Sequence, residues 1–526
     1  MVRTHSVPAL MVVTTTLTDG FMQEDLRTLG QWARIIPFEI GRWHTGRAHT
    51  WGLRGSRIVF SFINLLIRNR VQAIVFWFVT VPLVPLMVVI AKALGRKVIV
   101  ITGGSDAVYL PELDWGAMKS RQHQLSFDLV MRLADAVLPF SESAKAAVLK
   151  RHAPLHIRTT YPGIDTEFFH PGPAPRAQRV VTCCYRYNDA KIVQKGLDVF
   201  VATARLLPTV EFVVIGNPTD AAAEQFQRGA PPNVHFEARI ASRTAYRDYL
   251  QGTSVYAQLS AYEGFGVSLA EAMASGCIPI VTDRYSLPEV VGDRDLIVAY
   301  RDVEATARAV QQALTAPVAL RDRARQQITS HFDRRLREQT FHEELCQLIP
   351  TLSEPIIRIE LGCGNNAQPG VIGVDARRTS QTKAICDVRR ACFKAGIADE
   401  VYSFCVLEHM DNPYELLDEI VRLLKPDGQA VLRVPNLGTY SAHLDMTHRF
   451  LADLALWRLI LSGYFEDVMV VPVGTKYRDN RLLVTINKLL VRVFRFHELA
   501  QGWTFICRQK RAQPVRTYTA WWQEGQ

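Results

Sequence analysis

The chain has 526 residues, too many for one hydrophobic core, and this length predicts three or four domains. Hydrophobic residues make up 48% and charged residues 21%, a balance that fits folded globular domains and excludes extended disorder. The net charge of +10 and pI near 9.2 leave nucleic acid, an anionic membrane surface and phosphorylated substrates as candidate partners. Nine cysteines without C-x-x-C spacing indicate neither a zinc site nor a disulfide framework, and they fit a reducing cytosol.

The first 170 residues alternate strand-like and helix-like segments, which predicts a parallel sheet with helices on both faces. A buried first strand explains the N-terminal apolar run better than a signal peptide does. The expected strands are Ala9–Thr15, Ala73–Thr80, Val98–Thr102 and Ala136–Pro139, and the expected helices include Gln23–Ile35 and Pro82–Leu94.

The apolar stretch Ala73–Ala91 approaches the length of a membrane-spanning helix. Pro82 and Pro85 divide it into a β-branched, aromatic half and a helix-like half. A buried strand followed by a helix that opens on proline explains this division, so we favour it over a membrane span.

A proline-rich segment at residues 161–175 predicts an interdomain hinge, and a second alternating unit follows it. This unit ends in a charged helical stretch, Leu320–Leu348. The linker I-P-T-L-S-E-P then leads into a third α/β unit from Ile356 to about Lys510. The strands expected in the second unit are Arg179–Tyr185, Val210–Ile215, Val234–Phe236, Val255–Leu259 and Ile278–Thr282.

The most informative segment of the second unit is S-A-Y-E-G-F-G-V-S-L-A-E-A-M-A-S-G-C-I-P-I-V-T at residues 260–282. A strand ends near Ser260 and a helix begins near Val267, so unpaired backbone N–H groups can bind a phosphate there. Glu263 and Glu271 can both face one ligand and would bind sugar hydroxyls. Taken alone, such a pair is more often a helix cap and a solvated face.

The whole segment resembles the E-x7-E signature of family 4 glycosyltransferases, which are retaining enzymes of the GT-B fold. The resemblance covers about the first 345 residues. P-G-I-D-T-E-F-F-H-P (162–171) is similar to the family's interdomain segment, and C-Y-R-Y-N-D-A-K-I-V-Q-K-G (184–196) to its basic loop. V-V-I-G (213–216) and L-P-E-V-V-G-D (287–293) also lie where the family has them.

The resemblance implies roles for particular residues in binding a UDP- or GDP-linked sugar. Glu271 would hold the ribose, Glu263 would meet the transferred sugar, and Arg186 and Lys195 would neutralise the departing diphosphate. Cations placed in this way stabilise the transition state, so no metal is expected. The loop backbone beside the sugar would come from Gly264, Phe265 and Gly266.

The chain departs from this family in its first 110 residues. Many relatives carry a histidine after the strand in V-I-V-I-T-G-G-S-D (98–106), where this chain has Gly103 or Gly104. Asp106 is the remaining candidate for the sugar pocket. T-L-T-D-G-F-M (16–22) is only a thin counterpart of the family's first glycine loop.

The third unit opens with I-I-R-I-E-L-G-C-G-N-N-A-Q-P-G-V-I-G-V-D-A at residues 356–376. A strand, a G-x-G loop and an acid at the tip of the next strand suit a ribose-containing ligand, in NAD sites and methyl-donor sites alike. The loop lacks a third glycine and a long following helix, and Asp375 comes too early for a dinucleotide fingerprint.

With the run at 400–436, this unit resembles class I methyltransferases that use S-adenosylmethionine, over about Ile356–Arg508. The resemblance implies that Glu360, Gly362 and Gly364 hold the methionine portion of the cofactor. The remaining implied cofactor contacts are Asp375 on the ribose, Asp387 near the adenine and Glu408 beside the methyl-transfer pocket.

Methylation of a sugar hydroxyl needs a base. His448 is the first candidate, oriented by Asp445, and His409 is the second. A helix-capping Asp445 with a surface histidine is an equally good interpretation. A metal held by His443, Asp445 and His448 matches no strong template, so no metal is expected here either.

Two basic amphipathic segments, residues 57–70 and 480–497, are compatible with peripheral association with an anionic inner membrane, and equally with core-packing helices. Nucleic acid is not expected, because no basic stripe with interleaved aromatics occurs.

The sequence therefore predicts a bifunctional cytoplasmic enzyme that adds a sugar to a polysaccharide or glycolipid acceptor and methylates a glycan hydroxyl. Its predicted domains are an acceptor-side domain (1–170), a donor domain (171–349), a methyltransferase domain (350–511) and a tail (512–526). Alternatives are a non-catalytic S-adenosylmethionine-binding regulatory module, a non-glycan methyl acceptor, and a glycan-binding scaffold in place of the glycosyltransferase.

Overall fold

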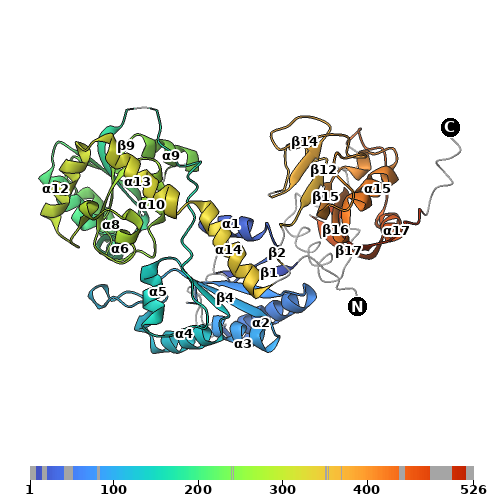
Figure 1. Cartoon of the computed structure of the whole chain (residues 1–526), viewed down its shortest axis with the longest axis horizontal. Coiled ribbons are helices and arrows are strands. Elements are labelled where there is room, and N and C mark those ends of the chain that lie inside the picture. The colour runs from blue at the N-terminus through green and yellow to red at the C-terminus, as the bar shows by residue number, and fades with distance from the viewer. Residues whose placement is uncertain are drawn as a thin grey trace. The chain divides into compact units, whose positions relative to one another are not determined.

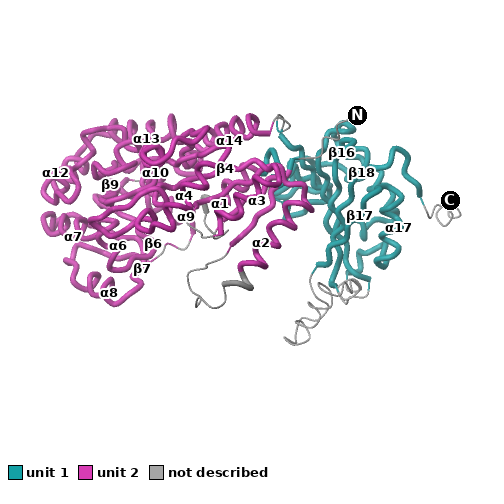
Figure 2. The backbone as a smooth tube through the Cα atoms, turned by 90° about the horizontal axis from the view of Figure 1, so that it is seen from below, with its two compact units in different colours: residues 1–8, 30–34, 351–526 teal, residues 9–29, 35–350 magenta. Residues whose placement is uncertain are grey.

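The computed structural model describes residues 8–14, 20–40, 51–79, 83–173, 175–238, 240, 242–349, 352, 355–368, 370–437, 445–473 and 500–516. The chain divides into two compact units (Figure 2). Unit 2 comprises Ala9–Leu29 and Ile35–Pro350, and unit 1 comprises Met1–Pro8, Gly30–Arg34 and Thr351–Gln526.

Unit 2 begins with a five-stranded sheet in the order β2-β1-β3-β4-β5 (Figure 1). The pairs β1–β3, β3–β4 and β4–β5 are parallel. β1, β3 and β5 are buried along their whole length, as their continuous apolar sequences require. The elements are β1 (Ala9–Thr14), α1 (Gly20–Leu29), β2 (Arg34–Glu39), α2 (Trp51–Arg68), β3 (Ala73–Trp77), α3 (Val84–Ala93), β4 (Lys97–Thr102), α4 (Arg121–Leu133), β5 (Ala136–Pro139) and α5 (Glu142–Leu149).

The predicted helix Gln23–Ile35 is wrong at its C-terminal end. α1 stops at Leu29 and β2 begins at Arg34. Gly30 favours a helix end, and Ile35 and Ile36 followed by a proline favour an extended chain. The helical periodicity of the whole segment led the sequence analysis to miss the change from helix to strand.

The division of Ala73–Ala91 by its prolines is confirmed, because β3 and α3 are separate elements. Among the described residues, no helix has both the length and the apolarity needed to cross a membrane. Pro82 and Thr80, predicted helix and strand ends, lie outside the described residues.

The second sheet of unit 2 has six strands in the order β11-β10-β9-β6-β7-β8, and each pair of neighbouring strands is parallel. Each strand predicted here overlaps an observed one. The elements are β6 (Ala177–Tyr187), α6 (Asp189–Gln194), α7 (Leu197–Leu206), β7 (Glu211–Pro218), α8 (Ala221–Arg228), β8 (Val234–Glu237), α9 (Arg243–Gln251), β9 (Thr253–Gln258), α10 (Val267–Ala274), β10 (Ile278–Thr282), α11 (Leu287–Val291), β11 (Ile297–Val298), α12 (Val303–Leu314), α13 (Val318–His331) and α14 (Arg334–Leu348).

The charged stretch predicted as one helical region, Leu320–Leu348, is two helices. Asp333 caps α14 by accepting the Arg335 N–H, which starts a new helix after α13. α14 then returns to the first sheet, where Arg337 forms a bidentate, buried ion pair with Asp25 of α1 at 2.7 Å. This pair fixes α14 against α1.

Unit 1 contains a seven-stranded sheet in the order β14-β13-β12-β15-β16-β18-β17. Its strands are parallel from β14 to β16, while β18 runs antiparallel to both neighbours. The predicted fold class, three α/β units of which two form a GT-B fold and the third a methyltransferase-like domain, each Rossmann-like, is thus confirmed. The elements are β12 (Arg358–Leu361), β13 (Ile372–Asp375), β14 (Ala384–Ile385), β15 (Ala398–Phe404), α15 (Pro413–Leu423), β16 (Leu424–Pro435), α17 (Leu454–Tyr464), β17 (Phe465–Val473) and β18 (Gly502–Lys510).

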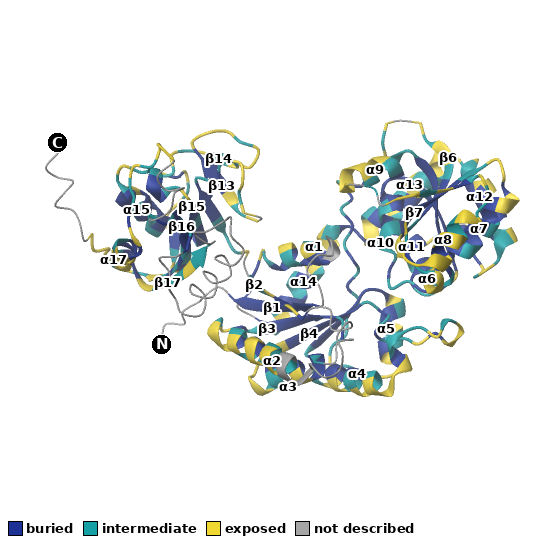
Figure 3. Ribbon diagram, turned by 180° about the vertical axis from the view of Figure 1, so that it is seen from behind, coloured by how far each residue is buried: buried dark blue, intermediate teal, exposed yellow. Residues whose placement is uncertain are grey.

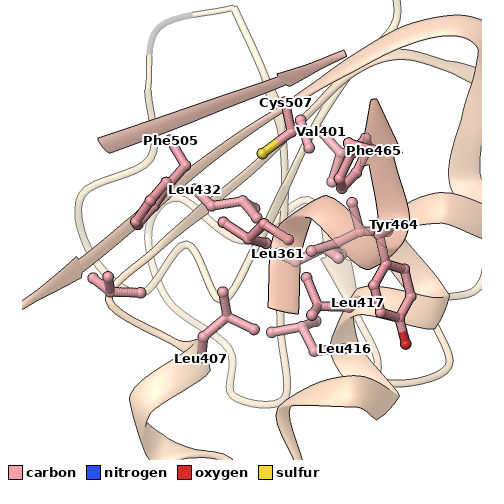
Figure 4. Close-up of a cluster of buried hydrophobic side chains, with 14 of the residues drawn as sticks. Leu361, Val401, Leu407, Leu416, Leu417, Leu432, Tyr464, Phe465, Phe505 and Cys507 are labelled. Atoms are coloured by element: carbon pink, nitrogen blue, oxygen red, sulfur yellow. The ribbon is translucent and has the colours of Figure 1, made fainter. Parts of the chain in front are cut away.

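The core of unit 1 lies between this sheet and α15 and α17 (Figure 4). Leu416 and Leu417 of α15 meet Leu361, Leu432 and other buried strand residues, and burying each such side chain contributes about 1.5–3 kcal/mol. Figure 3 shows that the central strands of the sheets are buried, whereas the helices expose one face.

The basic segment at residues 57–70 is amphipathic, as predicted. Most of it forms α2, which buries Phe62 and Leu66 and exposes Phe60 and Ile67. The second segment, 480–497, lies outside the described residues. Membrane association therefore stays a prediction.

Candidate active sites

The end of β9 and the start of α10 bring predicted donor-site residues together in unit 2. Glu263 lies in the loop between these elements, Glu271 lies on α10, and Lys195 follows α6. Lys195 Nζ donates to Glu263 Oε1 at 2.6 Å, and these side chains are only 26% and 12% exposed. The two groups predicted to meet the diphosphate and the sugar are therefore direct neighbours.

Two polar residues that the sequence analysis missed hold Glu263 in place. Gln258 Nε2 and Ser260 Oγ both donate to Glu263 Oε1 at 2.8 Å. Thr282 Oγ1 in turn donates to the Ser260 carbonyl at 2.8 Å. The sequence did contain a signal for these two residues. In Q-L-S (258–260), two polar residues stand at the end of a buried strand, immediately before the glycine loop.

Burial and charge shift the pKa values of two site residues. Burial disfavours the ammonium of Lys195, but the Glu263 carboxylate outweighs this effect and raises the pKa of Lys195. Burial also raises the pKa of Glu271 to about 7, although the Arg243 guanidinium opposes the shift. Lys195 is therefore charged at neutral pH, whereas Glu271 is close to half protonated.

The glycines of two loops pack closely between the two sheets of unit 2. A Cβ on Gly264 would lie 2.0 Å from the Gly103 carbonyl oxygen, and one on Gly104 would lie 1.9 Å from the Tyr262 hydroxyl. A side chain on Gly103 would collide with Phe78 at 2.3 Å. In this arrangement neither Gly103 nor Gly104 leaves room for the histidine that many relatives carry.

Asp106 lies in the same loop and is fully buried. Its Oδ1 accepts the Gly104 N–H at 3.0 Å, while its Oδ2 is buried without a hydrogen-bond partner among the described residues. Burial raises the pKa of Asp106 to about 7. Arg186, by contrast, is an exposed residue of β6, and its carbonyl accepts a hydrogen bond from Lys191 at 3.2 Å.

In unit 1, the glycine loop after β12 is held by the acid at the end of β13. Asp375 Oδ2 accepts the Gly364 N–H at 3.0 Å, and Oδ1 accepts the Arg377 N–H at 3.0 Å. Glu360, buried at the end of β12, accepts the Gln368 N–H at 2.6 Å. Burial raises the pKa of Glu360. Glu360 at the end of β12 and Asp375 at the end of β13 thus both hold the loop that carries Gly364.

The segment after β15 lies against this loop. A Cβ on Gly362 would lie 2.5 Å from Val406 Cγ2, and β12 and β15 are adjacent parallel strands. Glu408 follows Val406 and is buried. Asp387 differs from these residues, because it is exposed and pairs with Arg389 at 2.7 Å, which lowers the pKa of Asp387.

The two candidate bases lie side by side, with ring centroids 4.8 Å apart. Asp445 Oδ2 is 3.7 Å from His448 Nε2, longer than a hydrogen bond. Asp445 instead accepts from Thr447 Oγ1 at 2.5 Å, and Thr447 Oγ1 is 2.9 Å from His409 Nδ1. Thr447 was not predicted. Asp445 caps a turn here, and His443 lies outside the described residues.

Comparison with known protein families identifies the domains that carry these two sites. The family "Glycosyl transferases group 1" matches residues 166–331, and the family "Methyltransferase domain" matches residues 332–462. The chain contains a group 1 glycosyltransferase domain followed by a methyltransferase domain. Both are enzyme families, so the predicted recognition is confirmed for both parts.

The glycosyltransferase also resembles individual proteins. It is 28% identical over 217 residues to an alpha-maltose-1-phosphate synthase of Mycolicibacterium smegmatis, covering 37% of this chain and 56% of that protein. It is 44% identical over 55 residues to O-antigen chain mannosyltransferase B of Escherichia coli, 10% of this chain and 14% of that protein. The chain thus spans about half the length of the first relative and less of the second.

Solved structures share the GT-B fold of the glycosyltransferase. Sucrose-phosphate synthase from Thermosynechococcus elongatus has a TM-score of 0.54 at 16% identity, covering 65% of this chain and 99% of that one. Anabaena HepE, solved with UDP, has a TM-score of 0.52 at 14% identity, covering 65% of this chain and all of HepE (100%).

Proposed function

We propose that the glycosyltransferase moves a sugar from a nucleotide-sugar donor to a glycan acceptor with retention, and that the methyltransferase methylates a hydroxyl of that glycan. The observation that carries this proposal is the pair of donor-type loops in one chain, one around Glu263 and Lys195, the other around Asp375. Only residues 349–357 separate α14 from β12, so one acceptor would meet both sites at a high effective concentration.

UDP is the favoured nucleotide of the donor, because HepE was solved with UDP and with UDP-glucose. An O-antigen mannosyltransferase among the relatives supports a polysaccharide acceptor. Lys195 would neutralise the diphosphate as the glycosyl bond breaks, and Glu263 would orient the sugar beside it.

In the methyltransferase, S-adenosylmethionine would supply an electrophilic methyl group. The buried Glu360 and the Gly362–Gly364 loop suit its methionine portion, and Asp375 suits its ribose. Asp375 already accepts two backbone N–H groups, so its oxygens are oriented before any ligand binds. The exposed Asp387 is a weaker candidate for the adenine than the sequence suggested.

The direct test supplies the enzyme with UDP-sugars carrying one isotope, S-adenosylmethionine carrying another in its methyl group, and polysaccharide acceptors. We expect one glycan product that contains both labels. A methyl label that appears only on RNA or on carboxylates would contradict glycan methylation. Cofactor binding without any methylated product would instead support a regulatory module.

The raised pKa of Glu271 predicts a pH-dependent affinity for the nucleoside. Ribose hydroxyls donate to the carboxylate form, which is lost as the pH falls below about 7. The dissociation constant of uridine, which has no titrating phosphate, should therefore fall about tenfold from pH 6 to pH 8. In Glu271→Gln this pH dependence should vanish. Equal affinities at both pH values in the wild type would show that Glu271 does not bind the ribose.

A further inference from the structure

Three metal-ligating side chains converge beside the glycine loop of the methyltransferase. Glu408, His409 and His448 each offer a ligand atom, and these atoms all lie within 4.8 Å of one another. Glu408 is 1% exposed, and its Oε2 is buried without a hydrogen-bond partner among the described residues. The two histidines are half-buried.

The backbone holds these three residues together although His448 is distant in sequence. The Glu408 carbonyl accepts the N–H groups of Arg449 and Phe450, at 2.7 and 3.0 Å. This contact fixes the segment that carries His448 against the segment that carries Glu408 and His409. The proximity of the two segments is therefore a feature of the backbone fold.

A hydrogen bond orients the His409 ring, and a carboxylate lies near the His448 ring without a hydrogen bond to it. Thr447 Oγ1 is 2.9 Å from His409 Nδ1, and Asp445 Oδ1 accepts from that hydroxyl at 2.5 Å. Asp445 Oδ2 lies 3.7 Å from His448 Nε2. Hydroxyl and carboxylate groups around the outer nitrogens of imidazole ligands are the usual surroundings of metal-binding histidines.

A buried carboxylate oxygen without a partner is unfavourable. A proton or a cation would relieve the cost. A ligand atom of each of two imidazoles lies within 4.8 Å of the carboxylate oxygen, and this set of nitrogen and oxygen ligands suits a metal cation.

We propose that Glu408, His409 and His448 bind one divalent first-row transition-metal ion. One carboxylate and two imidazoles suit Mn²⁺, Co²⁺ or Zn²⁺ better than Mg²⁺, which prefers oxygen ligands. Three protein ligands leave coordination positions open. The sequence analysis expected no metal. The site that it considered consisted of His443, Asp445 and His448, which are close together in the sequence.

The position of the ion suggests a role in methyl transfer. Only this role, and not the metal site itself, rests on the methylation proposed above. Val406 touches Gly362 of the cofactor loop, so the ion would lie beside the predicted methyl donor. An acceptor hydroxyl bound at an open position would have a lowered pKa, as metal-bound water does. The histidines would then act as ligands and not as the general base.

The test is a titration of the chelator-treated full-length chain with Co²⁺, followed by visible absorption and by calorimetry, without cofactor or acceptor. We expect one tight site per chain in the wild type. His448→Ala and Glu408→Gln should each weaken it at least about tenfold. His235→Ala, which removes an exposed histidine of β8, is the matched control and should bind as the wild type does.

Either of two results overturns the metal site: no Co²⁺ binding by the wild type, or equal binding by the wild type, His448→Ala and Glu408→Gln. Thermal unfolding followed by circular dichroism, measured without metal on each variant, reports whether the chain is folded. If Glu408→Gln fails to fold, His448→Ala and His409→Ala decide the question. A metal site without methyl transfer would refute the proposed function but leave the site intact.

Discussion

Replacing Lys195 with alanine should lower kcat/KM for sugar transfer by about 10²–10³, because one preorganised partner of the developing phosphate charge is removed. The same change leaves Glu263 without its ion pair at 2.6 Å. Its carboxylate would then still accept from Gln258 and Ser260, which should keep the loop in place. Initial rates with a UDP-sugar measure the effect.

Lys150→Ala is the matched control, since it removes an exposed lysine of the same unit and should leave the rate unchanged. Binding of S-adenosylhomocysteine should also be unaffected by Lys195→Ala. A Lys195→Ala enzyme with the wild-type rate would show that the phosphate charge is neutralised elsewhere, with the exposed Arg186 as the first alternative.

Replacing Asp375 with alanine should raise the dissociation constant of S-adenosylhomocysteine at least about 100-fold. Hydrogen bonds to a charged group contribute about 1.5–3 kcal/mol each, and the ribose would donate two. The change also removes the acceptor of the Gly364 N–H, which orients the cofactor loop. Isothermal titration calorimetry measures the loss.

Two further variants separate these contributions. Asp375→Asn keeps an acceptor oxygen for the loop but loses the charge, so its effect should be intermediate. Asp467→Ala removes an aspartate of β17, at the opposite edge of the same sheet, and should bind as the wild type does. Wild-type affinity in Asp375→Ala would place the ribose elsewhere.

Much of the fold could be predicted because each parallel strand is a continuous apolar run between helical segments. The exceptions have local causes. Gly30 favours the end of α1 and the residues before Pro37 favour the extended β2, while Asp333 starts a new helix where the charge pattern continues unbroken. In both cases the sequence analysis gave more weight to the helical periodicity of the whole segment than to the local residues that end one element and begin the next.

Site residues carried by one loop were easier to predict than those brought together by the fold. Glu263, Gly364 and Asp375 stand in recognisable local motifs. Gln258, Thr447 and the approach of His448 to Glu408 depend on contacts between segments that the sequence does not align. The closeness of Gly103 to Gly264 is likewise a property of the packed domains.

The central claim is that one chain has two separate donor sites. Its most direct test is calorimetric melting of the wild type, Lys195→Ala and Asp375→Ala, each with UDP or S-adenosylhomocysteine at a hundred times its dissociation constant for the wild type, which adds about 2.7 kcal/mol to a binding domain. We predict that UDP stabilises only the wild type and Asp375→Ala, and that S-adenosylhomocysteine stabilises only the wild type and Lys195→Ala. No stabilisation of the wild type by S-adenosylhomocysteine, or loss of both responses in a single variant, would contradict the account.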